Sequence, residues 1–324
     1  MSPLPDFMRA DIRCCVCNNS ESERFSLKYQ KEKFAVTECT NCGFQFIPAY
    51  YRKQIKYVQY KNEEVTKAVR EGNNWVKVQR HKLRFRFIKK FIRKGSLFDL
   101  GAGWGHFLLA AKESGYEISG IEISEQPYLY CVNDLKLPVE HIDFFEFKTE
   151  KKFDVITLWD VLEHIDEADK FLTRCNLFTK QDGWLFLQVP QIDSYFAKRY
   201  KDNWKMMGLD HVNYFSKKTI EKILNRNGYE LVSIKSSLEI KLFIMYTFLP
   251  FIKKLKGSKK SFNQTNLDIN ASQRQQYFNK FTSRPMWQLK IFIFIHNIIY
   301  NTLSFFNIGE EMMVAARKKH AASS

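Results

Sequence analysis

Three glycines lie within five residues in the stretch DLGAGWG, at Gly101, Gly103 and Gly105. Glycine lets a backbone turn sharply and come close to a bound molecule, because it has no side chain. The apolar residues before the stretch predict a buried strand, and the apolar run FLLAA after it predicts a helix. A strand, a glycine-rich loop and the first turn of a helix together form a common cradle for nucleotide-like ligands.

Two carboxylates accompany these glycines. Asp99 lies two residues before Gly101, and Glu122 follows Gly101 by 21 residues, at the expected end of the next strand. A carboxylate in that position is suited to binding the two hydroxyl groups of a ribose. The dinucleotide fingerprint G-x-G-x-x-G requires a third glycine where this chain has His106. The pattern therefore predicts an adenosine ligand and leaves open what is attached to the adenosine.

The stretch from Asp99 to Gly105 resembles the first motif, D/E-x-G-x-G-x-G, of the class I S-adenosylmethionine (SAM) methyltransferases. The resemblance implies that Asp99, Gly101, Gly103 and Gly105 belong to the cofactor site, where the backbone of the loop contacts the methionine part of SAM. It also implies that Glu122 binds the ribose, and that the seventh strand of the sheet lies antiparallel between the fifth and the sixth.

Two later stretches continue the resemblance. In related enzymes an acid and an apolar residue after the third strand bond the amine of adenine and cover its ring, which assigns these roles to Asp143 and Phe144. The stretch FDVITLWDVLEHI resembles the fourth motif of the family, in the branch that includes the ubiquinone-pathway O-methyltransferases. It implies that Trp159 lies beside the cofactor. Asp160 is expected at the carboxyl end of a central strand, where ligands of doubly wound sheets bind.

Two histidines are candidates for the reaction itself, together with Asp160. His211 lies in DHVNYFS, which resembles a signature of methyltransferases associated with bacterial surface sugars. An oxygen or activated carbon must lose a proton to accept a methyl group, and a histidine that titrates near neutrality suits that task. His164 in VLEHI is the second candidate. Structural alternatives remain: His211 orients the next helix, and Glu163 with His164 holds a loop at a helix start.

Four cysteines in two C-x-x-C pairs predict a metal site near the N-terminus. The pairs are Cys14/Cys17 and Cys39/Cys42, and 21 residues separate them. Two close pairs of thiolates suit tetrahedral Zn²⁺, with each pair on a tight turn. Because four protein ligands leave no open position, we expect a structural zinc in a small ribbon over residues 11–48.

Composition and charge limit the compartment and the kinds of partner that the protein can have. The 324 residues carry a formal net charge of +16 and are 45% hydrophobic, enough to build a core. No apolar N-terminal stretch resembles a signal peptide or a membrane span, so we expect a cytoplasmic protein without disulfides. Residues 77–94 contain nine Lys or Arg and no acid, with apolar residues at helical spacing. We interpret this run as a helix with a solvated basic face. The alternative is that the run attracts a phosphate-bearing partner, among which nucleic acid is the least favoured.

Five segments are expected to position these residues in an α/β fold. The fold class is a Rossmann-like, seven-stranded class I methyltransferase sheet with an N-terminal zinc ribbon and a helical insertion before the last strand. The segments are a zinc-ribbon-like module (1–50), a helical connector over the cofactor site (51–94), the SAM-binding core (95–238), an apolar and basic insertion (239–308), and the last strand with a tail (309–324). Ser216 is expected to begin a core helix, Gly228 to end it, and the sixth strand to follow.

The insertion contains two apolar stretches on either side of a basic linker. The first, LFIMYTFLPFI, is too short to span a bilayer, and the second is interrupted by polar residues. Two amphipathic helices in this place would cap the core, form a homodimer surface, or lie on the inner face of a membrane. We favour the first two uses.

The predicted function is SAM-dependent methyl transfer, as O- or C-methylation, to a small molecule, a glycan or a lipid-linked sugar. Two alternatives remain, an NAD-dependent sugar-nucleotide enzyme on a Rossmann sheet and a non-catalytic zinc-ribbon protein that only binds a partner. Asp99 and the absence of a third glycine at His106 disfavour the first. The intact glycine motif and Glu122 disfavour the second.

Overall fold

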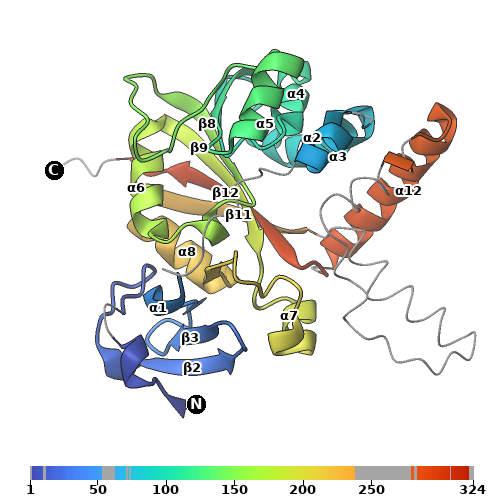
Figure 1. Ribbon diagram of the computed structural model, residues 1–324. Coiled ribbons are helices and arrows are strands. Elements are labelled where there is room, and N and C mark those ends of the chain that lie inside the picture. Colours follow the sequence, from blue (N-terminus) through green and yellow to red (C-terminus); the bar gives the residue numbers. More distant parts are fainter. Residues whose placement is uncertain are drawn as a thin grey trace, which may run out of the picture.

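The computed structural model describes residues 2–9, 12–52, 63–70, 72, 74–237, 279–280, 283–306 and 308–320. Two sheets organise this part of the chain, and Figure 1 shows the larger one above the smaller. The larger sheet consists of β5 (Ser96–Leu100), β6 (Glu117–Ile121), β7 (Val139–Glu140), β8 (Phe153–Trp159), β9 (Thr179–Pro190), β11 (Tyr229–Ser237) and β12 (Glu311–Lys318).

The strand order of the larger sheet is β11-β12-β9-β8-β5-β6-β7. Strands β5 to β9 run parallel, whereas β12 is antiparallel to both of its neighbours, β9 and β11. In chain order, β9, β11 and β12 are the fifth, sixth and seventh strands of this sheet. The seventh strand therefore lies antiparallel between the fifth and the sixth, and the predicted fold class is confirmed.

Helices cover both faces of this sheet because its strands are apolar on both sides. Adjacent residues of one strand face opposite layers. Phe98 belongs to the buried cluster that includes side chains of α6 (Ala168–Phe178) and α8 (Lys217–Arg226), and Leu97 belongs to the cluster that includes side chains of α4 (His106–Glu113). The shorter helix α5 (Glu125–Leu129) follows β6, and α7 (Tyr195–Tyr200) follows β9. This arrangement leaves the carboxyl ends of the parallel strands for loops.

The predicted boundaries of α8 are confirmed. The Ser216 hydroxyl accepts a 3.2 Å hydrogen bond from the Thr219 amide, and the Thr219 hydroxyl accepts one from the Ser216 amide, which is a complete capping box. Gly228 has a φ of +79°, beyond the end of the helix, and β11 follows it. A residue in the left-handed region directly after a helix is a common stop signal.

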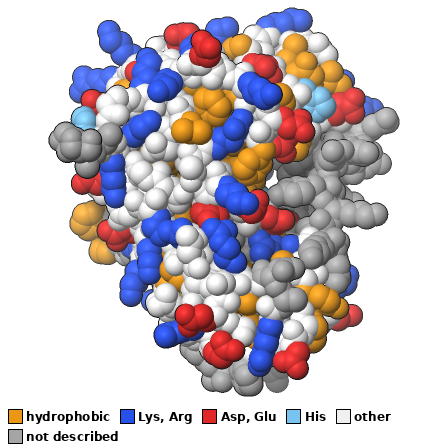
Figure 2. Space-filling view, turned by 90° about the vertical axis from the view of Figure 1, so that its left-hand side faces the viewer, with side chains coloured by type: hydrophobic (Ala, Val, Ile, Leu, Met, Phe, Trp, Pro, Cys, Tyr) orange, Lys and Arg blue, Asp and Glu red, His pale blue; other side chains and the backbone are white. Residues whose placement is uncertain are grey.

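The predicted basic helix corresponds to α3 (Asn74–Ile88), which follows α2 (Glu63–Arg70). Val78, Phe85 and Ile88 are buried on it, and the Phe85 ring stacks on Phe107 of α4 at 4.7 Å between centroids. Arg86 is exposed on this helix, whereas the side chain of Arg84 is mostly buried. On another side of the molecule, drawn in Figure 2, Lys and Arg side chains are spread among acidic and uncharged ones.

The smaller sheet belongs mainly to the N-terminal module. Its strand order is β1-β2-β3-β4-β10, with β1 (Ser2–Pro3), β2 (Phe25–Gln30), β3 (Ala35–Cys39), β4 (Gln45–Phe46) and β10 (Asn213–Tyr214). The short helix α1 (Ala49–Arg52) follows β4. Strand β10 comes from the stretch before α8 and pairs antiparallel with β4, so a segment of the core completes the sheet of the module.

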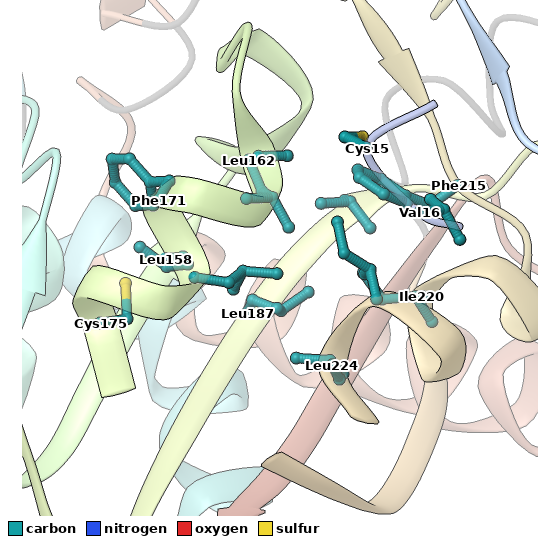
Figure 3. Close-up of a cluster of buried hydrophobic side chains, with 14 of the residues drawn as sticks. Cys15, Val16, Leu158, Leu162, Phe171, Cys175, Leu187, Phe215, Ile220 and Leu224 are labelled. Atoms are coloured by element: carbon teal, nitrogen blue, oxygen red, sulfur yellow. The ribbon is translucent and has the colours of Figure 1, made fainter. Parts of the chain in front are cut away.

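The module and the core share one hydrophobic cluster, drawn in Figure 3. Val16 of the module is fully buried beside Phe215 and Ile220 of the core, in a cluster that continues to Leu158 and Leu187 of the large sheet. Burial of this kind is the main favourable contribution to folding, at roughly 25 cal/mol per Å². We therefore expect the two parts to unfold together.

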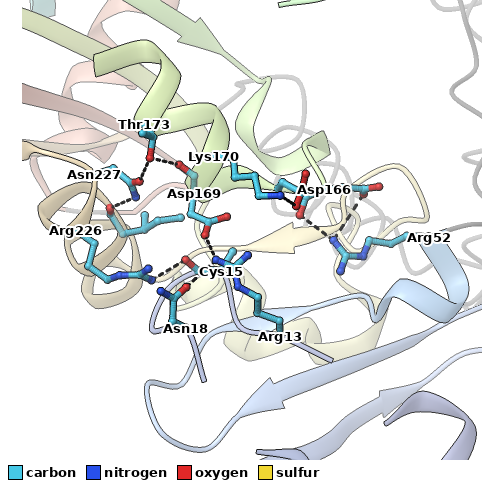
Figure 4. Close-up of polar contacts among 12 residues, drawn as sticks. Arg13, Cys15, Asn18, Arg52, Asp166, Asp169, Lys170, Thr173, Arg226 and Asn227 are labelled. Atoms are coloured by element: carbon cyan, nitrogen blue, oxygen red, sulfur yellow. Dashed lines mark hydrogen bonds and ion pairs between the residues drawn. The ribbon is translucent and has the colours of Figure 1, made fainter. Parts of the chain in front are cut away.

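Polar contacts at the same boundary are shown in Figure 4. Arg13 of the module forms an ion pair with Asp169 of α6. Arg226 at the end of α8 donates a 3.0 Å hydrogen bond to the backbone carbonyl of Cys15. Arg52 of α1 donates a 2.9 Å bond to the carbonyl of Asp166. These contacts fix the orientation of the module on the core.

The described part of the predicted insertion is the helix α12 (Met286–Phe305). It packs against α3 and β11, and Ser304 donates a 2.6 Å hydrogen bond to the carbonyl of Ser236. Large apolar side chains remain exposed along it, at Trp287, Ile291, Phe294, Ile298 and Phe305. The first apolar stretch and the basic linker of the insertion lie outside the described residues. Among the residues that the structure describes, none of the helices is long and apolar enough to cross a membrane.

Candidate active site

The glycine loop connects β5 to the first turn of α4, and all three of its glycines have positive φ. A Cβ added to Gly101 would lie 2.9 Å from Val161 Cγ2, and one added to Gly105 would lie 2.7 Å from Leu137 Cδ1. Neighbouring side chains therefore leave no room for a side chain at Gly101 or Gly105. A Cβ at Gly103 would meet no atom within 4 Å, so the loop presents open space there. The loop thus fits the cradle that the sequence predicts.

Glu122 follows β6 directly and is bonded to this loop. One of its carboxylate oxygens accepts a 2.7 Å hydrogen bond from the Gly103 amide, and the other accepts a 2.7 Å bond from the Ser124 amide. A carboxylate has about four lone-pair positions, so each oxygen can accept one further bond. Glu122 can therefore still accept hydrogen bonds from the two hydroxyl groups of a ribose.

Asp99 lies inside the sheet, beneath the loop. Its side chain is nearly inaccessible, and it accepts a 2.6 Å hydrogen bond from the Thr157 hydroxyl on the neighbouring strand β8. Burial raises the pKa of Asp99 to about 7. The hydrogen bond with Thr157 therefore joins Asp99 on β5 to strand β8. The predicted role of Asp99 in the cofactor site stays a prediction.

The loop after β7 contains the two residues predicted at adenine. Asp143 is half-buried, and its carboxylate accepts a 2.7 Å hydrogen bond from the Phe145 amide. The Phe144 ring is buried against Phe171 of α6, with 4.6 Å between centroids, so its predicted contact with adenine stays a prediction. The exposed apolar side chains of this region are Ile123 and Phe145.

Trp159 and Asp160 end strand β8, where Arg84 of α3 contacts both. The Asp160 carboxylate accepts hydrogen bonds from Arg84 Nη2 at 2.7 Å and from Gln188 Nε2 at 2.9 Å. The Arg84 guanidinium lies 4.7 Å from the centroid of the Trp159 ring, a cation–π contact. Asp160 has a φ of +60°, which turns the chain away from the strand. Helix α3 therefore packs directly over the predicted acceptor side of the site.

The two candidate histidines lie together, although 46 residues separate them in the sequence. Their ring centroids are 4.8 Å apart in an edge-to-face arrangement. His164 Nδ1 is 2.6 Å from the carbonyl oxygen of Asp210, and His211 Nδ1 is 2.7 Å from that of Met206. A carbonyl only accepts, so Nδ1 carries the hydrogen in both rings and Nε2 is the acceptor nitrogen.

Glu163 is the third member of this group. A carboxylate oxygen of Glu163 and one ring nitrogen of each histidine all lie within 4.8 Å of one another. The side chain of Glu163 is 1% exposed, and burial raises the pKa of its carboxyl well above the usual range, with a further contribution from the charge of Asp160. Burial, followed by the charge of His164, lowers the pKa of His211. The site thus combines a buried acid with two imidazoles.

The comparisons with known proteins decide between the adenosine ligands. Residues 76–234 match the family described as "Methyltransferase domain". This part of the chain is a methyltransferase domain, and it is similar to those of the class I SAM-dependent methyltransferases. The match begins within α3, in the segment predicted from the sequence as a connector.

Relatives of the methyltransferase domain are distant. The chain is 24% identical over 100 residues to the ubiquinone biosynthesis O-methyltransferase of Bordetella avium (29% of this chain and 42% of that protein), and 28% identical over 104 residues to that of Actinobacillus pleuropneumoniae (29% and 44%). It thus spans less than half the length of these two relatives. A solved SAM-dependent methyltransferase from Archaeoglobus fulgidus is 19% identical, with a TM-score of 0.46, over 76% of this chain and 95% of that one.

Sequence reasoning missed three residues that lie against the predicted site residues. Arg84 is one of nine basic residues in its run, and spacing does not tell which of them points inward. Gln188 lies on β9 without a motif around it, and it bonds to both Asp160 and Glu311. Glu163 is not among the predicted site residues, and it is named from the sequence only beside His164, with holding a loop as one alternative. The signal available in the sequence was an acid directly before a candidate histidine, His164.

The four cysteines of the N-terminal module converge as predicted. Their sulfur atoms all lie within 4.8 Å of one another, with 3.6 Å between Cys14 and Cys42 and 3.7 Å between Cys17 and Cys39. Four sulfurs at the corners of a tetrahedron, each about 2.3 Å from Zn²⁺, would be about 3.8 Å apart. The Asn41 side chain donates a 3.5 Å hydrogen bond to Cys17 Sγ, the kind of outer contact that orients a thiolate. The donor set and its spacing fit the ion.

Proposed function

We propose that this protein transfers the methyl group of SAM to an oxygen, or to an activated carbon, of a small-molecule or glycan acceptor, including a lipid-linked sugar. The observation that carries the proposal is the group of Glu163, His164 and His211 near the carboxyl end of β8, in the same molecule as the open glycine loop. Ligands of doubly wound sheets bind at this edge.

The residues that would hold SAM lie at the ends of β5, β6 and β7. The loop around Gly103 offers open space for a close backbone approach, and Glu122 offers further lone pairs to the ribose hydroxyls. The half-buried carboxylate of Asp143 would accept a hydrogen bond from the adenine amine. SAM supplies an electrophilic methyl group on its sulfonium. The residues of this chain would align the acceptor and exclude water.

The acceptor side of the site would handle the proton of the nucleophile. His211 Nε2 is an acceptor nitrogen in a ring that is fixed through Nδ1 by the carbonyl of Met206. His164 is fixed in the same way by the carbonyl of Asp210. An acceptor hydroxyl that donates a hydrogen bond to His211 Nε2 would pass its proton to that nitrogen as the methyl group is transferred.

We further propose a structural Zn²⁺ in the cysteine cluster and a binding role for α12. The sulfur spacing supports the zinc. The contacts of α12 with α3 and β11 support its use as a cap on the core, and its exposed apolar side chains support a dimer or membrane surface. Gel filtration with light scattering, together with sedimentation with anionic vesicles, distinguishes these uses.

Mass spectrometry tests the proposed acceptor. Metabolites and surface glycans from cells with and without the protein are compared for a difference of 14 Da, the mass of one CH₂ group. A species that gains 14 Da only when the wild-type protein is present identifies the acceptor. If no such species appears among small molecules, glycans or lipid-linked sugars, the proposed acceptor class is wrong.

A further inference from the structure

The group of Glu163, His164 and His211 has the composition of a metal site. It contributes two imidazoles and one carboxylate, with ligand atoms within 4.8 Å of one another. Two histidines and one carboxylate bind divalent ions such as Fe²⁺, Mn²⁺, Co²⁺ and Zn²⁺ and leave coordination positions open. The set differs from the four cysteines, which leave no open position.

Both imidazoles are oriented in the way that metal-binding histidines usually are. Such a ring binds the ion through one nitrogen and donates the hydrogen of the other to a carbonyl or carboxylate. Here the Nδ1 hydrogens go to the carbonyls of Asp210 and Met206. The segment 206–213, which contains His211, is also hydrogen-bonded to the backbone of Glu163. The Val212 amide donates a 2.8 Å hydrogen bond to the carbonyl of Glu163.

Glu163 provides an independent observation. Its side chain is 1% exposed, and one carboxylate oxygen, Oε2, has no hydrogen-bond partner among the described residues. Burying such an oxygen without a partner is unfavourable by a few kcal/mol. Most buried polar atoms in folded proteins have a partner, and a metal ion is a suitable partner for a buried carboxylate oxygen.

We propose that Glu163, His164 and His211 bind a divalent first-row transition-metal ion. The ion would satisfy the buried carboxylate and use the acceptor nitrogens of both rings. If the proposed function is correct, an open position on the ion would take an oxygen of the acceptor and hold it near the methyl group. The His211 nitrogen would then be a ligand and no longer the proton acceptor. The ion would instead lower the pKa of the bound hydroxyl, whose proton would leave to solvent before the methyl group is transferred.

Metal content measured on the full-length protein tests this site. The wild-type protein and its variants are equilibrated with Zn²⁺ or Co²⁺ at a buffered free concentration, freed of excess ion, and analysed by inductively coupled plasma mass spectrometry. We expect His211→Ala and Glu163→Gln each to hold about one ion per chain fewer than the wild type. His320→Ala, at an exposed histidine that contacts Asp182, is the matched control and keeps the wild-type content.

Variants of the other cluster separate the two sites. Cys39→Ser is expected to lose the ion of the cysteine cluster and to keep the ion of the histidine site, which His211→Ala in the same chain then removes. Circular dichroism and SAM affinity are measured on every variant, so that loss of metal through unfolding is recognised. One variant removes an imidazole, and the other, Glu163→Gln, replaces the carboxylate by an amide of nearly the same shape. The test therefore does not depend on the folding of a single variant.

The outcomes also separate this site from the proposed function. A wild-type protein whose metal content equals that of folded His211→Ala and Glu163→Gln overturns the metal site, and intact SAM binding in the same samples leaves the proposed function standing. An ion that is lost in both variants supports the metal site. If the same wild-type protein fails to bind SAM, the proposed function is wrong while the metal site stands.

Discussion

The Gly103 amide donates a 2.7 Å hydrogen bond to the carboxylate of Glu122, and this bond joins the glycine loop to the end of β6. The acid predicted for the ribose therefore also holds the loop predicted for the methionine part of SAM. Gly103 has a φ of +52°, and a Cβ there would project into open space. This relationship makes Gly103 the position where a side chain would interfere most directly with the cofactor.

Gly103→Val is expected to abolish SAM binding, because a branched side chain would occupy the space that the ligand needs. Isothermal titration calorimetry measures the affinity. Gly115→Val is the matched control: Gly115 also has a positive φ, and a Cβ there also meets no atom within 4 Å, but it lies beyond the other end of α4. Both variants place a β-branched residue at a positive φ, which costs backbone energy in each. Unchanged affinity in Gly103→Val would refute the cradle.

Asp99 predicts a pH dependence of stability. Burial raises its pKa to about 7 in the folded protein, from an ordinary value of 3.8. The folded state therefore keeps a proton that the unfolded chain has released, and this residue makes stability fall as the pH rises from about 4 to about 7. In Asp99→Asn the uncharged amide oxygen still accepts the Thr157 hydrogen bond. The free energy of unfolding of the variant minus that of the wild type should then increase over this pH range and level off above it.

Urea denaturation at several pH values measures this difference. Asp6→Asn serves as the control, because the side chain of Asp6 is 96% exposed. A difference between Asp99→Asn and the wild type that is constant from pH 4 to pH 8 would show that the carboxyl of Asp99 is not protonated in the folded protein.

His211→Ala is expected to leave SAM affinity nearly unchanged and to lower turnover by roughly 10²- to 10⁴-fold, the usual contribution of a positioned proton-transfer group. The assay uses the acceptor that the 14 Da comparison identifies, and His320→Ala is its control. If His211 only orients the backbone before α8, activity should instead fall in proportion to the folded fraction. Full activity of a folded His211→Ala protein would remove this residue from the site, and His164 would be tested next.

Cys39→Ser is expected to release about one zinc per chain, because three thiolates bind the ion more weakly than four. Since Val16 and Phe215 share one hydrophobic cluster, the variant should also lower the melting temperature of the methyltransferase core in a single transition. Cys15→Ser is the control, because its sulfur is not part of the cluster. Wild-type protein purified without zinc under reducing, chelator-free conditions would contradict the predicted ribbon.

The fold and the cofactor loop could be predicted because their signals are local. The glycines, the cap at Ser216 and the strand at residues 311–318 each depend on a few neighbouring residues or on a simple period. The pairing of β10 with β4 could not be predicted, because two-residue strands have no period and their pairing joins Asn213 to Phe46. Nor does the sequence tell that Arg84 reaches Asp160, because the choice of one basic side chain among nine depends on how α3 packs.

Calorimetric titration of the wild-type protein with SAM and, separately, with NAD tests the central claim most directly. Both ligands contain an adenosine that Glu122 would hold, so the comparison depends on what is attached to it. We expect SAM to bind at one site per chain, NAD to show no saturable binding, and SAM binding to be lost in Gly103→Val and kept in Gly115→Val. Saturable binding of NAD with none of SAM would contradict the assignment of this chain as a SAM-dependent methyltransferase.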